Sequence, residues 1–287
     1  MSIDKNENTE SEILRLENIN FCYETGEIAL CKVSLTIAKG ERIAVIGNNG
    51  AGKSTFFLCC NGILKQDSGD IFYHGKKLSQ SRKDLFLLRK NVGLVLQDPD
   101  NQMIASTVES EISFGPMNLG LTDDEVLERV DDAISEMKLT SLRCRPPHYL
   151  SGGEKKRVCI ADIIAMRPEI VLLDEPASSL DPQNAASLEQ TIIELGNAGI
   201  TVAVSTHDVD FAWRWADRII VFSDAQIVAD TSPDMVFADI ELLKTAGLRK
   251  PEIYELTEIA YKTANKNPPK RFPKTKEEFA MAIGGIL

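Results

Sequence analysis

Short apolar runs bounded by glycine and charged residues recur along the chain. Residues 13–23 and 30–37 alternate between apolar and polar positions, as half-buried β-strands do. The run RIAVIG at 42–47 is almost wholly apolar, which indicates a buried strand of a parallel sheet. The same patterns predict further strands at 69–75, 91–97, 169–174, 200–206, 218–223 and 225–230.

Helical patterns separate these strands. We expect a helix at 54–64, directly after a glycine-rich loop, and another at 183–199. From 98 to about 167 the pattern is helical, with clear helices at 122–137, where a threonine precedes an acidic first turn, and at 152–166. Alternating strands and helices predict an α/β domain with a mainly parallel sheet and a helical subdomain on it.

The two ends of the chain depart from this pattern. Residues 1–12 are polar and acidic, which is typical of a disordered tail and unlike a secretory signal. Residues 231–287 contain short helical patterns and a link rich in Pro and Lys, and we interpret them as an appended module. The sequence has no run of about 18 uncharged apolar residues, so it predicts no membrane-spanning helix.

Composition narrows the classes of function. The chain has 287 residues, 43% of them hydrophobic and 26% charged, which is ordinary for a globular protein with its own core. A net charge of −11 argues against a nucleic-acid binder with a basic face, and 6% aromatic residues argue against a base-stacking platform. The six cysteines form no CxxC pair, so we expect reduced, mostly buried thiols of a cytosolic protein.

The segment GNNGAGKST at 47–55 matches G-x-x-x-x-G-K-[ST] between a predicted strand and a predicted helix, as a phosphate-binding P-loop requires. Its glycines let backbone N–H groups turn inward around phosphate oxygens, and the helix start adds positive potential. Lys53 would contact the β- and γ-phosphates, and the Ser54 hydroxyl would bind Mg²⁺. The predicted nucleotide contacts are Gly47, Asn48, Asn49, Gly50, Ala51, Gly52, Lys53, Ser54 and Thr55.

Two further loops carry candidate chemistry. The strand at 169–174 ends in two acids, of which Asp174 would orient a Mg²⁺-bound water and Glu175 would act as general base. Taken alone, acids are common where a strand meets a loop. A second anion-binding helix start follows Leu150, and it suggests that one ATP lies between the P-loop of one subunit and this loop of another. The loop consists of Ser151, Gly152 and Gly153.

Together these motifs resemble the ATPases of ABC transporters. LSGGE at 150–154 is similar to their signature LSGGQ, and it occurs between the P-loop and IVLLDEP, as in that family. The resemblance implies four more functional residues: Gln97 as the Q-loop ligand of Mg²⁺, Asp181 in the D-loop near ATP, His207 as the catalytic switch histidine, and Tyr23 as the aromatic that stacks on adenine. Taken singly, Gln97 is a polar strand end, His207 a loop histidine, and Tyr23 a strand aromatic packed on the sheet.

Segment 95–121 resembles more specifically the CbiO and EcfA ATPases of energy-coupling factor (ECF) importers. The implied fold is a P-loop NTPase of the α/β class, with a RecA-like mixed sheet core, an antiparallel β subdomain and a helical subdomain at about 98–167. The ABC ATPase domain would cover 13–230, and 231–287 would be a helical extension that helps two subunits dimerise. The sequence departs from the common pattern at Glu154, where Gln is usual, and at Ala177, where Thr is frequent.

The resemblance implies ATP hydrolysis with Mg²⁺, coupled to import of a micronutrient: a cobalt or nickel ion, or a vitamin. The implied partners are a second ATPase subunit, identical or homologous, an integral membrane coupling subunit of the EcfT or CbiQ kind, and a substrate-binding membrane component. The chain would then lie at the cytoplasmic face of the membrane, with no nucleic-acid partner. Two alternatives stay open: the ATPase of a conventional ABC transporter, and a non-transport ABC ATPase acting on ribosomes or DNA.

Overall fold

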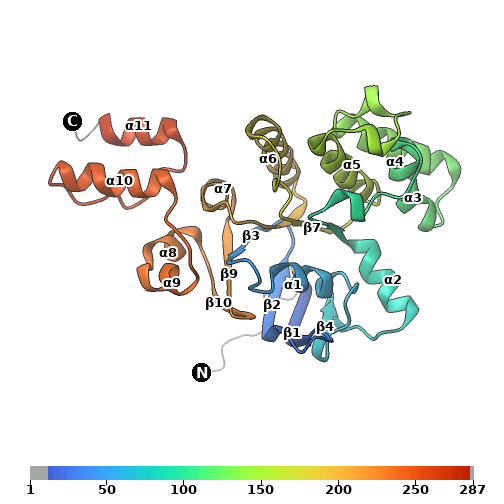
Figure 1. Cartoon of the computed structure of the whole chain (residues 1–287), viewed down its shortest axis with the longest axis horizontal. Coiled ribbons are helices and arrows are strands. Elements are labelled where there is room, and N and C mark those ends of the chain that lie inside the picture. The colour runs from blue at the N-terminus through green and yellow to red at the C-terminus, as the bar shows by residue number, and fades with distance from the viewer. Residues whose placement is uncertain (1–11, 285–287) are drawn as a thin grey trace.

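The computed structural model describes residues 12–284, which form a small antiparallel sheet, a larger mixed sheet and two groups of helices (Figure 1). The strands are β1 Glu12–Cys22, β2 Ile28–Ala38, β3 Arg42–Gly47, β4 Ser68–Tyr73, β5 Lys76–Lys77, β6 Val92–Val95, β7 Ile170–Asp174, β8 Thr201–Ser205, β9 Arg218–Ser223 and β10 Gln226–Thr231. The small sheet has the order β2-β1-β4-β5 and the larger one β10-β9-β3-β8-β7-β6. All pairs in the small sheet are antiparallel, and in the larger sheet only β10 runs against its neighbour.

The helices are α1 Lys53–Cys60, α2 Arg82–Asn91, α3 Val108–Asn118, α4 Asp123–Glu136, α5 Gly152–Ala165, α6 Pro182–Asn197, α7 Val209–Trp215, α8 Pro233–Ala238, α9 Ile240–Thr245, α10 Glu252–Thr263 and α11 Lys276–Gly284. In Figure 1, α3 to α5 lie at one end of the molecule and α8 to α11 at the opposite end. The predicted fold class is therefore confirmed, with a mixed core sheet, an antiparallel sheet, a group of helices before β7 and C-terminal helices.

Two local predictions need correction, and one helix was missed. The helix expected to continue to residue 64 ends at Cys60, because Asn61 caps it and Gly62 turns the chain at φ +74°. Helix α2 was not predicted, since only one of its residues, Leu88, is buried and the apolar signal is weak. The predicted tail lies outside the described residues, except for Glu12, with which β1 begins.

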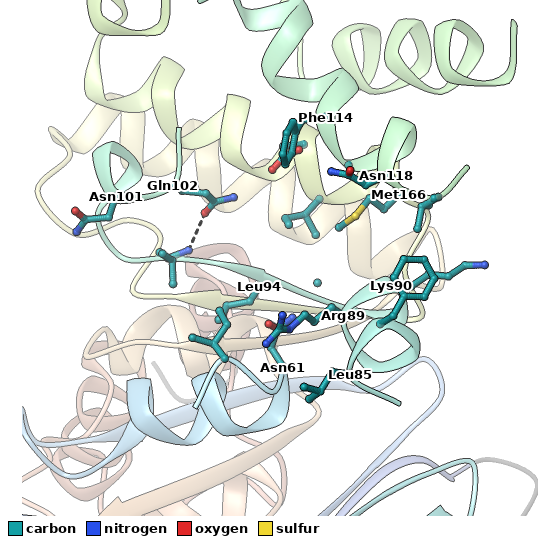
Figure 2. Close-up of a pocket in the computed structure, with 18 of the residues that line it drawn as sticks. Asn61, Leu85, Arg89, Lys90, Leu94, Asn101, Gln102, Phe114, Asn118 and Met166 are labelled. Carbon is teal, nitrogen blue, oxygen red and sulfur yellow. Dashed lines mark hydrogen bonds between the residues drawn. The ribbon is translucent and has the colours of Figure 1, made fainter. Parts of the chain in front are cut away.

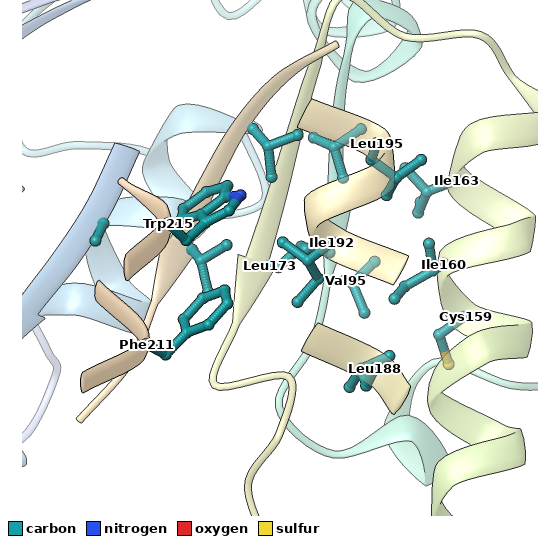
Figure 3. Close-up of a cluster of buried hydrophobic side chains, with 14 of the residues drawn as sticks. Val95, Cys159, Ile160, Ile163, Leu173, Leu188, Ile192, Leu195, Phe211 and Trp215 are labelled. Carbon is teal, nitrogen blue, oxygen red and sulfur yellow. The ribbon is translucent and has the colours of Figure 1, made fainter. Parts of the chain in front are cut away.

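The larger sheet is covered on one face by α6, which packs between the sheet and α5 (Figure 3). The apolar residues of α6 recur at helical spacing, so they form one buried stripe. Truncating one of them, Ile192, to Ala would cost about 2–5 kcal/mol, the usual range for a buried aliphatic side chain. The buried contacts are Leu188, Ile192 and Leu195 from α6, Val95 and Leu173 from the sheet, and Cys159, Ile160 and Ile163 from α5.

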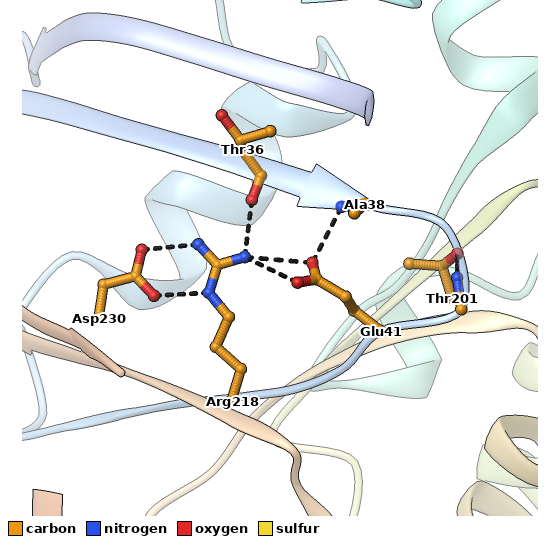
Figure 4. A network of polar contacts seen from close by, with 7 residues as sticks. Thr36, Ala38, Glu41, Thr201, Arg218 and Asp230 are labelled. Carbon is orange, nitrogen blue, oxygen red and sulfur yellow. Dashed lines mark hydrogen bonds and ion pairs between the residues drawn. The ribbon is translucent and has the colours of Figure 1, made fainter. Parts of the chain in front are cut away.

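Arg218, at the start of β9, joins the two sheets (Figure 4). Its Nε and Nη2 donate to the two carboxylate oxygens of Asp230 at 2.5 and 2.7 Å. Its Nη1 donates to the Thr36 carbonyl at 2.9 Å and to Glu41 at 3.0 and 3.1 Å. Such planar, charge-assisted contacts are strong and directional. They hold β2 and the β2–β3 turn against the larger sheet, and β3 leads directly into the P-loop.

Two general expectations can be compared with the structure. No helix within residues 12–284 is long and apolar enough to cross a membrane. The six cysteines are free, but only Cys59, Cys60 and Cys159 are buried, so the expectation that most of them are buried is wrong.

Candidate active site

The P-loop lies between β3 and α1, and at two of its glycines the neighbouring backbone leaves no room for a side chain. Gly47 has φ +147°, and a Cβ there would lie 2.2 Å from the Phe222 carbonyl oxygen. Gly52 has φ +104°, and a Cβ there would lie 2.3 Å from the Ala29 carbonyl oxygen. Glycine is required at both positions, because both the left-handed backbone and the close contacts exclude other residues.

Lys53 points its ammonium group into this loop. The residue is only 6% exposed, and its Nζ donates to the carbonyls of Gly47 at 2.7 Å and Asn48 at 3.1 Å. Burial lowers the pKa of Lys53, and the nearby carboxylates of Glu175 and Asp174 partly oppose that shift. The loop therefore surrounds a buried cation, an arrangement suited to phosphate oxygens.

A cavity of about 470 Å³ beside the loop collects predicted residues from distant parts of the chain. Its size is within the usual range for small-molecule sites. Glu27, Ala29 and Ser178 also line it. Glu27 and Ala29 belong to no motif, and Ser178 begins the D-loop segment SSLD, in which only Asp181 was predicted as a site residue. The predicted residues in the lining are Tyr23, Asn49, Gly50, Ala51, Gly52, Lys53, Ser54, Thr55, Gln97, Glu175 and His207.

Tyr23 follows the last residue of β1 and is 38% exposed at the edge of this cavity. Its hydroxyl is hydrogen-bonded to Thr55 Oγ1 at 2.8 Å, and its ring meets Phe21 edge-on at 5.0 Å. The ring is thus fixed by the P-loop and by its own strand. Tyr23 therefore stands at the edge of the cavity, and its contact with adenine stays a prediction.

The parallel pairing of β7 with β8 brings the acidic residues and the histidine together, because it places Asp174 opposite Ser205. The Ser205 hydroxyl donates to Asp174 Oδ1 at 2.5 Å and accepts the backbone N–H of Glu175 at 3.0 Å. Glu175 Oε2 lies 2.8 Å from Nδ1 of His207. Sequence reasoning missed Ser205, although it stands two residues before His207 at the end of a strand.

Gln97 lines the cavity from the loop after β6, and its backbone carbonyl accepts a hydrogen bond from Nζ of Lys156. Lys156 belongs to α5 and is only 3% exposed, and burial lowers its pKa. The helix that begins at the signature loop is therefore tied to a residue that lines the 470 Å³ cavity of its own chain. Lys156 was missed because its partner is a backbone atom far away in the sequence.

Ser151, at the signature loop, caps α5 instead of lining the cavity. Its Oγ accepts the N–H of Glu154 at 3.4 Å, and its own N–H donates to Glu154 Oε2 at 2.7 Å. The backbone hydrogen bond from Ser151 is the main reason why the pKa of Glu154 is lowered. A carboxylate at position 154 therefore completes a capping box, which explains how an acid can replace the usual amide.

In the neighbouring D-loop, Asp181 likewise caps a helix and lies outside the cavity lining. Asp181 caps α6 by accepting the N–H groups of Gln183 and Asn184, both at 3.1 Å. Gly153 packs so closely on this helix that a Cβ would lie 2.8 Å from Asn184 Oδ1. Gly152 has space for a Cβ, with Leu180 at 3.4 Å. The predicted residues that the structure leaves outside the 470 Å³ cavity's lining are Gly47, Asn48, Ser151, Gly152, Gly153, Asp174 and Asp181.

The residues proposed for Mg²⁺ offer the oxygen atoms that this ion prefers. Ser54 and Gln97 share the cavity, and Asp174 at the end of β7 is 6% exposed. Within the described chain no three His, Cys, Asp or Glu side chains form a cluster able to hold a metal. Mg²⁺ is usually bound through one or two carboxylates together with substrate phosphates, and its binding at this site stays a prediction.

A second cavity of about 920 Å³ opens between α2, β6 and α3 (Figure 2). We call it the lateral groove. Its walls are largely apolar, with Leu94, Phe114 and Met166 among them, and α2 adds the cations Arg89 and Lys90. The groove is adjacent to the 470 Å³ cavity. Gln102, which lines the groove, accepts the N–H of Leu96 at 3.1 Å, and the next residue, Gln97, lines the other cavity.

Asp162 of α5 also lines the lateral groove. Burial raises the pKa of its carboxyl group to about 7, and the nearby charge of Glu111 adds to the shift. Glu111 itself is buried and accepts the backbone N–H groups of Ile104 and Ala105 at 2.9 and 2.6 Å.

Comparison with known proteins gives matches over most of the chain. The family model described as "ABC transporter" matches residues 30–178. The energy-coupling factor transporter ATP-binding protein EcfA of Methanothermobacter thermautotrophicus is 43% identical over 244 residues, which is 85% of this chain and 78% of that protein. EcfA of Methanocaldococcus jannaschii is 42% identical over 253 residues, covering 88% of this chain and 91% of that protein.

Two solved structures are similar in fold. CbiO1 of Clostridium perfringens, described as part of the ABC transporter complex CbiONQ, has a TM-score of 0.73 and 38% identity, covering 86% of this chain and 99% of that one. The ATP-binding cassette MJ0796, in a dimeric post-hydrolysis state with ADP and Pi, has a TM-score of 0.69 and 27% identity. That alignment covers 77% of this chain and 99% of that one.

Proposed function

The chain belongs to the ABC transporter family, as an ATPase of the energy-coupling factor type, and we propose that it powers uptake of a micronutrient through a separate membrane subunit. The proposed cargo is a cobalt or nickel ion, or a vitamin. The observation that carries the proposal is the cavity in which the P-loop, Gln97, Glu175 and His207 meet, in a chain similar to EcfA proteins over most of its length.

The cavity suggests a division of labour in hydrolysis. The P-loop and Lys53 hold the phosphates, and Tyr23 contacts the adenine. Glu175 takes a proton from the attacking water, and His207, 2.8 Å away, keeps that carboxylate in place. Ser54, Gln97 and Asp174 would hold Mg²⁺, which would neutralise charge on the transferred phosphoryl group.

A complete site requires a second subunit in this proposal. The signature loop and Asp181 lie outside the cavity of their own chain, so they are available to a partner's ATP. The dimeric cassette MJ0796 is similar in fold. The C-terminal module, residues 231–287, supports the same idea, because it exposes large apolar side chains that a second subunit would cover. These are Met235, Ile240, Leu256, Ile259 and Met281.

The lateral groove is the proposed binding site for an apolar helix of the membrane coupling subunit. That subunit would in turn bind the substrate-binding component. The groove exposes Phe86 and Phe114, each more than half exposed. Helix α2 adds cations beside the groove, although the chain as a whole has a net charge of −11. Cations there complement the anionic lipid headgroups of a cytoplasmic membrane face. The chain would therefore be peripheral to that face.

The test is co-expression of the chain with the membrane proteins encoded beside its gene, followed by separation of membranes from ribosomes on a gradient. Wild type should sediment with the membranes, and Phe114→Asp should remain in the supernatant while still binding ATP. Leu127→Asp is the matched control, since Leu127 is also 50% exposed on the helical part but does not line the groove. Sedimentation with ribosomes, unaffected by Phe114→Asp, would instead favour a non-transport ATPase.

Uptake separates the importer from the remaining alternative. Cells with the assembled complex should accumulate labelled cobalt, nickel or a vitamin, and accumulation should disappear with Lys53→Ala. Export, or a purified complex whose membrane partner resembles a conventional ABC permease, would contradict the proposal.

A further inference from the structure

Gly247, in the turn after α9, brings the C-terminal module into contact with the P-loop. A Cβ at position 247 would lie 2.4 Å from Nδ2 and 2.6 Å from Oδ1 of Asn48, far inside van der Waals contact, so it would displace the amide end of the Asn48 side chain. The backbone is left-handed, with φ +62°. The N–H of Gly247 donates to the Lys244 carbonyl at 3.2 Å, and that of Leu248 to the Leu243 carbonyl at 2.8 Å. These are the hydrogen bonds of a Schellman cap, so the turn has a defined geometry.

The turn is held against the sheet that carries the P-loop. Leu243 of α9 and Ala246, its C-cap residue, are 5% and 0% exposed, and they belong to the same hydrophobic cluster as Ile46 and Val221. Ile46 precedes Gly47 on β3, and Val221 lies opposite it on β9. The turn is therefore anchored in the buried core that also contains the residue before Gly47, and displacing it would disturb that core.

Asn48 connects this turn to the phosphate site. Its side chain faces Gly247, and its backbone carbonyl accepts a hydrogen bond from Lys53 Nζ at 3.1 Å. We propose that Gly247 is a positioning residue for the P-loop. Because Gly247 has no side chain, the turn of the C-terminal module can pack against Asn48, and this packing sets the affinity of the P-loop for ATP. The inference rests on the proposed function, in that the P-loop is the ATP site.

The test compares two glycines in the same kind of turn. Helix α6 is followed by an alanine and then Gly199, just as α9 is followed by an alanine and then Gly247. The backbone of Gly199 has φ +84°. Its N–H donates to the Gly196 carbonyl at 3.0 Å and the next N–H to the Leu195 carbonyl at 3.3 Å, but a Cβ there would meet nothing within 4 Å. Gly199→Ala therefore introduces the same backbone strain without the contact. The probe is a fluorescent ATP analogue titrated into the full chain.

Gly247→Ala should weaken binding of the analogue at least about 5-fold, the lower end of typical coupling between sites. Gly199→Ala should change it by less than about 2-fold, as a surface substitution does. Asn48→Ala removes the side chain that Gly247 faces, so adding Gly247→Ala to it should cause no further loss. Equal effects of the two glycine variants, or an undiminished effect of Gly247→Ala beside Asn48→Ala, would overturn the inference.

Hydrogen exchange on the wild-type chain provides a measurement that needs no variant. Because coupling is reciprocal, a non-hydrolysable ATP analogue should slow exchange of the amides of Gly247 and Leu248 and leave those of Gly199 and Ile200 unchanged. No difference between the two turns would overturn the inference, although the ATPase assignment would survive. Failure of the wild-type chain to bind the analogue would instead remove the ATP site and both proposals with it.

Discussion

Glu175→Gln isolates the proposed proton acceptor, because the structure predicts that little else changes. The amide has the size of the carboxylate and can keep a hydrogen bond to His207 Nδ1, which lies 2.8 Å from Glu175 Oε2. The backbone N–H of Glu175 still donates to the Ser205 hydroxyl and carbonyl, at 3.0 and 3.1 Å. We therefore expect the free energy of unfolding to change by no more than about 1 kcal/mol.

The catalytic effect should be much larger than the structural one. An amide cannot take a proton from water, and general base catalysis usually contributes about 10²–10⁴-fold, or about 2.7–5.4 kcal/mol of barrier. ATP affinity should stay the same or increase, because the variant removes a negative charge near Lys53 without touching the P-loop. The expected result is tight ATP binding with very slow hydrolysis.

The assay is phosphate release at saturating MgATP, with affinity measured by a fluorescent analogue and mass by light scattering. ATP-bound Glu175→Gln should accumulate as a dimer. Glu189→Gln is the control, since Glu189 is half-buried on α6, pairs with Arg214 at 2.9 Å and lies outside the cavity lining. Turnover of Glu175→Gln within about 3-fold of wild type would refute the reasoning, as this is far below the usual size of base catalysis.

Three further substitutions test neighbouring parts of the site. Lys53→Ala should weaken ATP binding itself, because the ammonium contacts phosphates in the ground state; an unchanged dissociation constant would contradict this. Ser205→Ala should lower the free energy of unfolding by about 1.5–3 kcal/mol, since Asp174 loses a charge-assisted hydrogen bond; an unchanged urea midpoint would count against it. The raised pKa of Asp162 means that the folded chain keeps a proton which the unfolded chain has lost, so wild-type stability should fall as pH rises from about 4 to about 7. Asp162→Asn should remove up to about 4 kcal/mol of that decline, and an identical pH profile would show that Asp162 does not cause it.

Local patterns were enough to predict the parts of the site that are continuous in sequence. The P-loop is one strand, one glycine-rich turn and one helix start, so its spacing alone indicated both structure and chemistry. The strand pattern also indicated the two acids at the end of β7, whereas His207 after β8 was expected only from the resemblance to ABC transporter ATPases. The pairing of β7 with β8 shows why they meet. The capping box of Ser151 and Glu154 follows the S-x-x-E pattern, yet only the geometry showed that the carboxylate turns back to Ser151.

Contacts between distant segments were beyond the sequence pattern. Ser205 matters because the register of β7 and β8 puts it opposite Asp174. Lys156 matters because α5 passes the backbone of Gln97, and Gly247 because its turn meets Asn48. Neither a lysine within a helix nor a glycine at the end of a helix is part of a sequence pattern that indicates a contact with a distant segment.

In the proposed mechanism two ATPase subunits share each ATP, with the signature loop of one completing the site of the other. Ser151→Asp tests it without removing the helix cap, since Asp caps as well as Ser but places a carboxylate where a partner's γ-phosphate would lie. Thr122→Asp is the matched control, because Thr122 and Glu125 form the same capping box at the start of α4. The measurement is ATP hydrolysis by Ser151→Asp and Lys53→Ala subunits, separately and mixed.

Ser151→Asp alone should bind ATP like wild type and hydrolyse little, whereas Thr122→Asp should remain active. Mixing with inactive Lys53→Ala subunits should restore part of the activity, because each heterodimer contains one site with neither change. If Ser151→Asp weakens ATP binding to the isolated subunit as much as Lys53→Ala does, or if the mixture is no more active than its components, the shared site is contradicted.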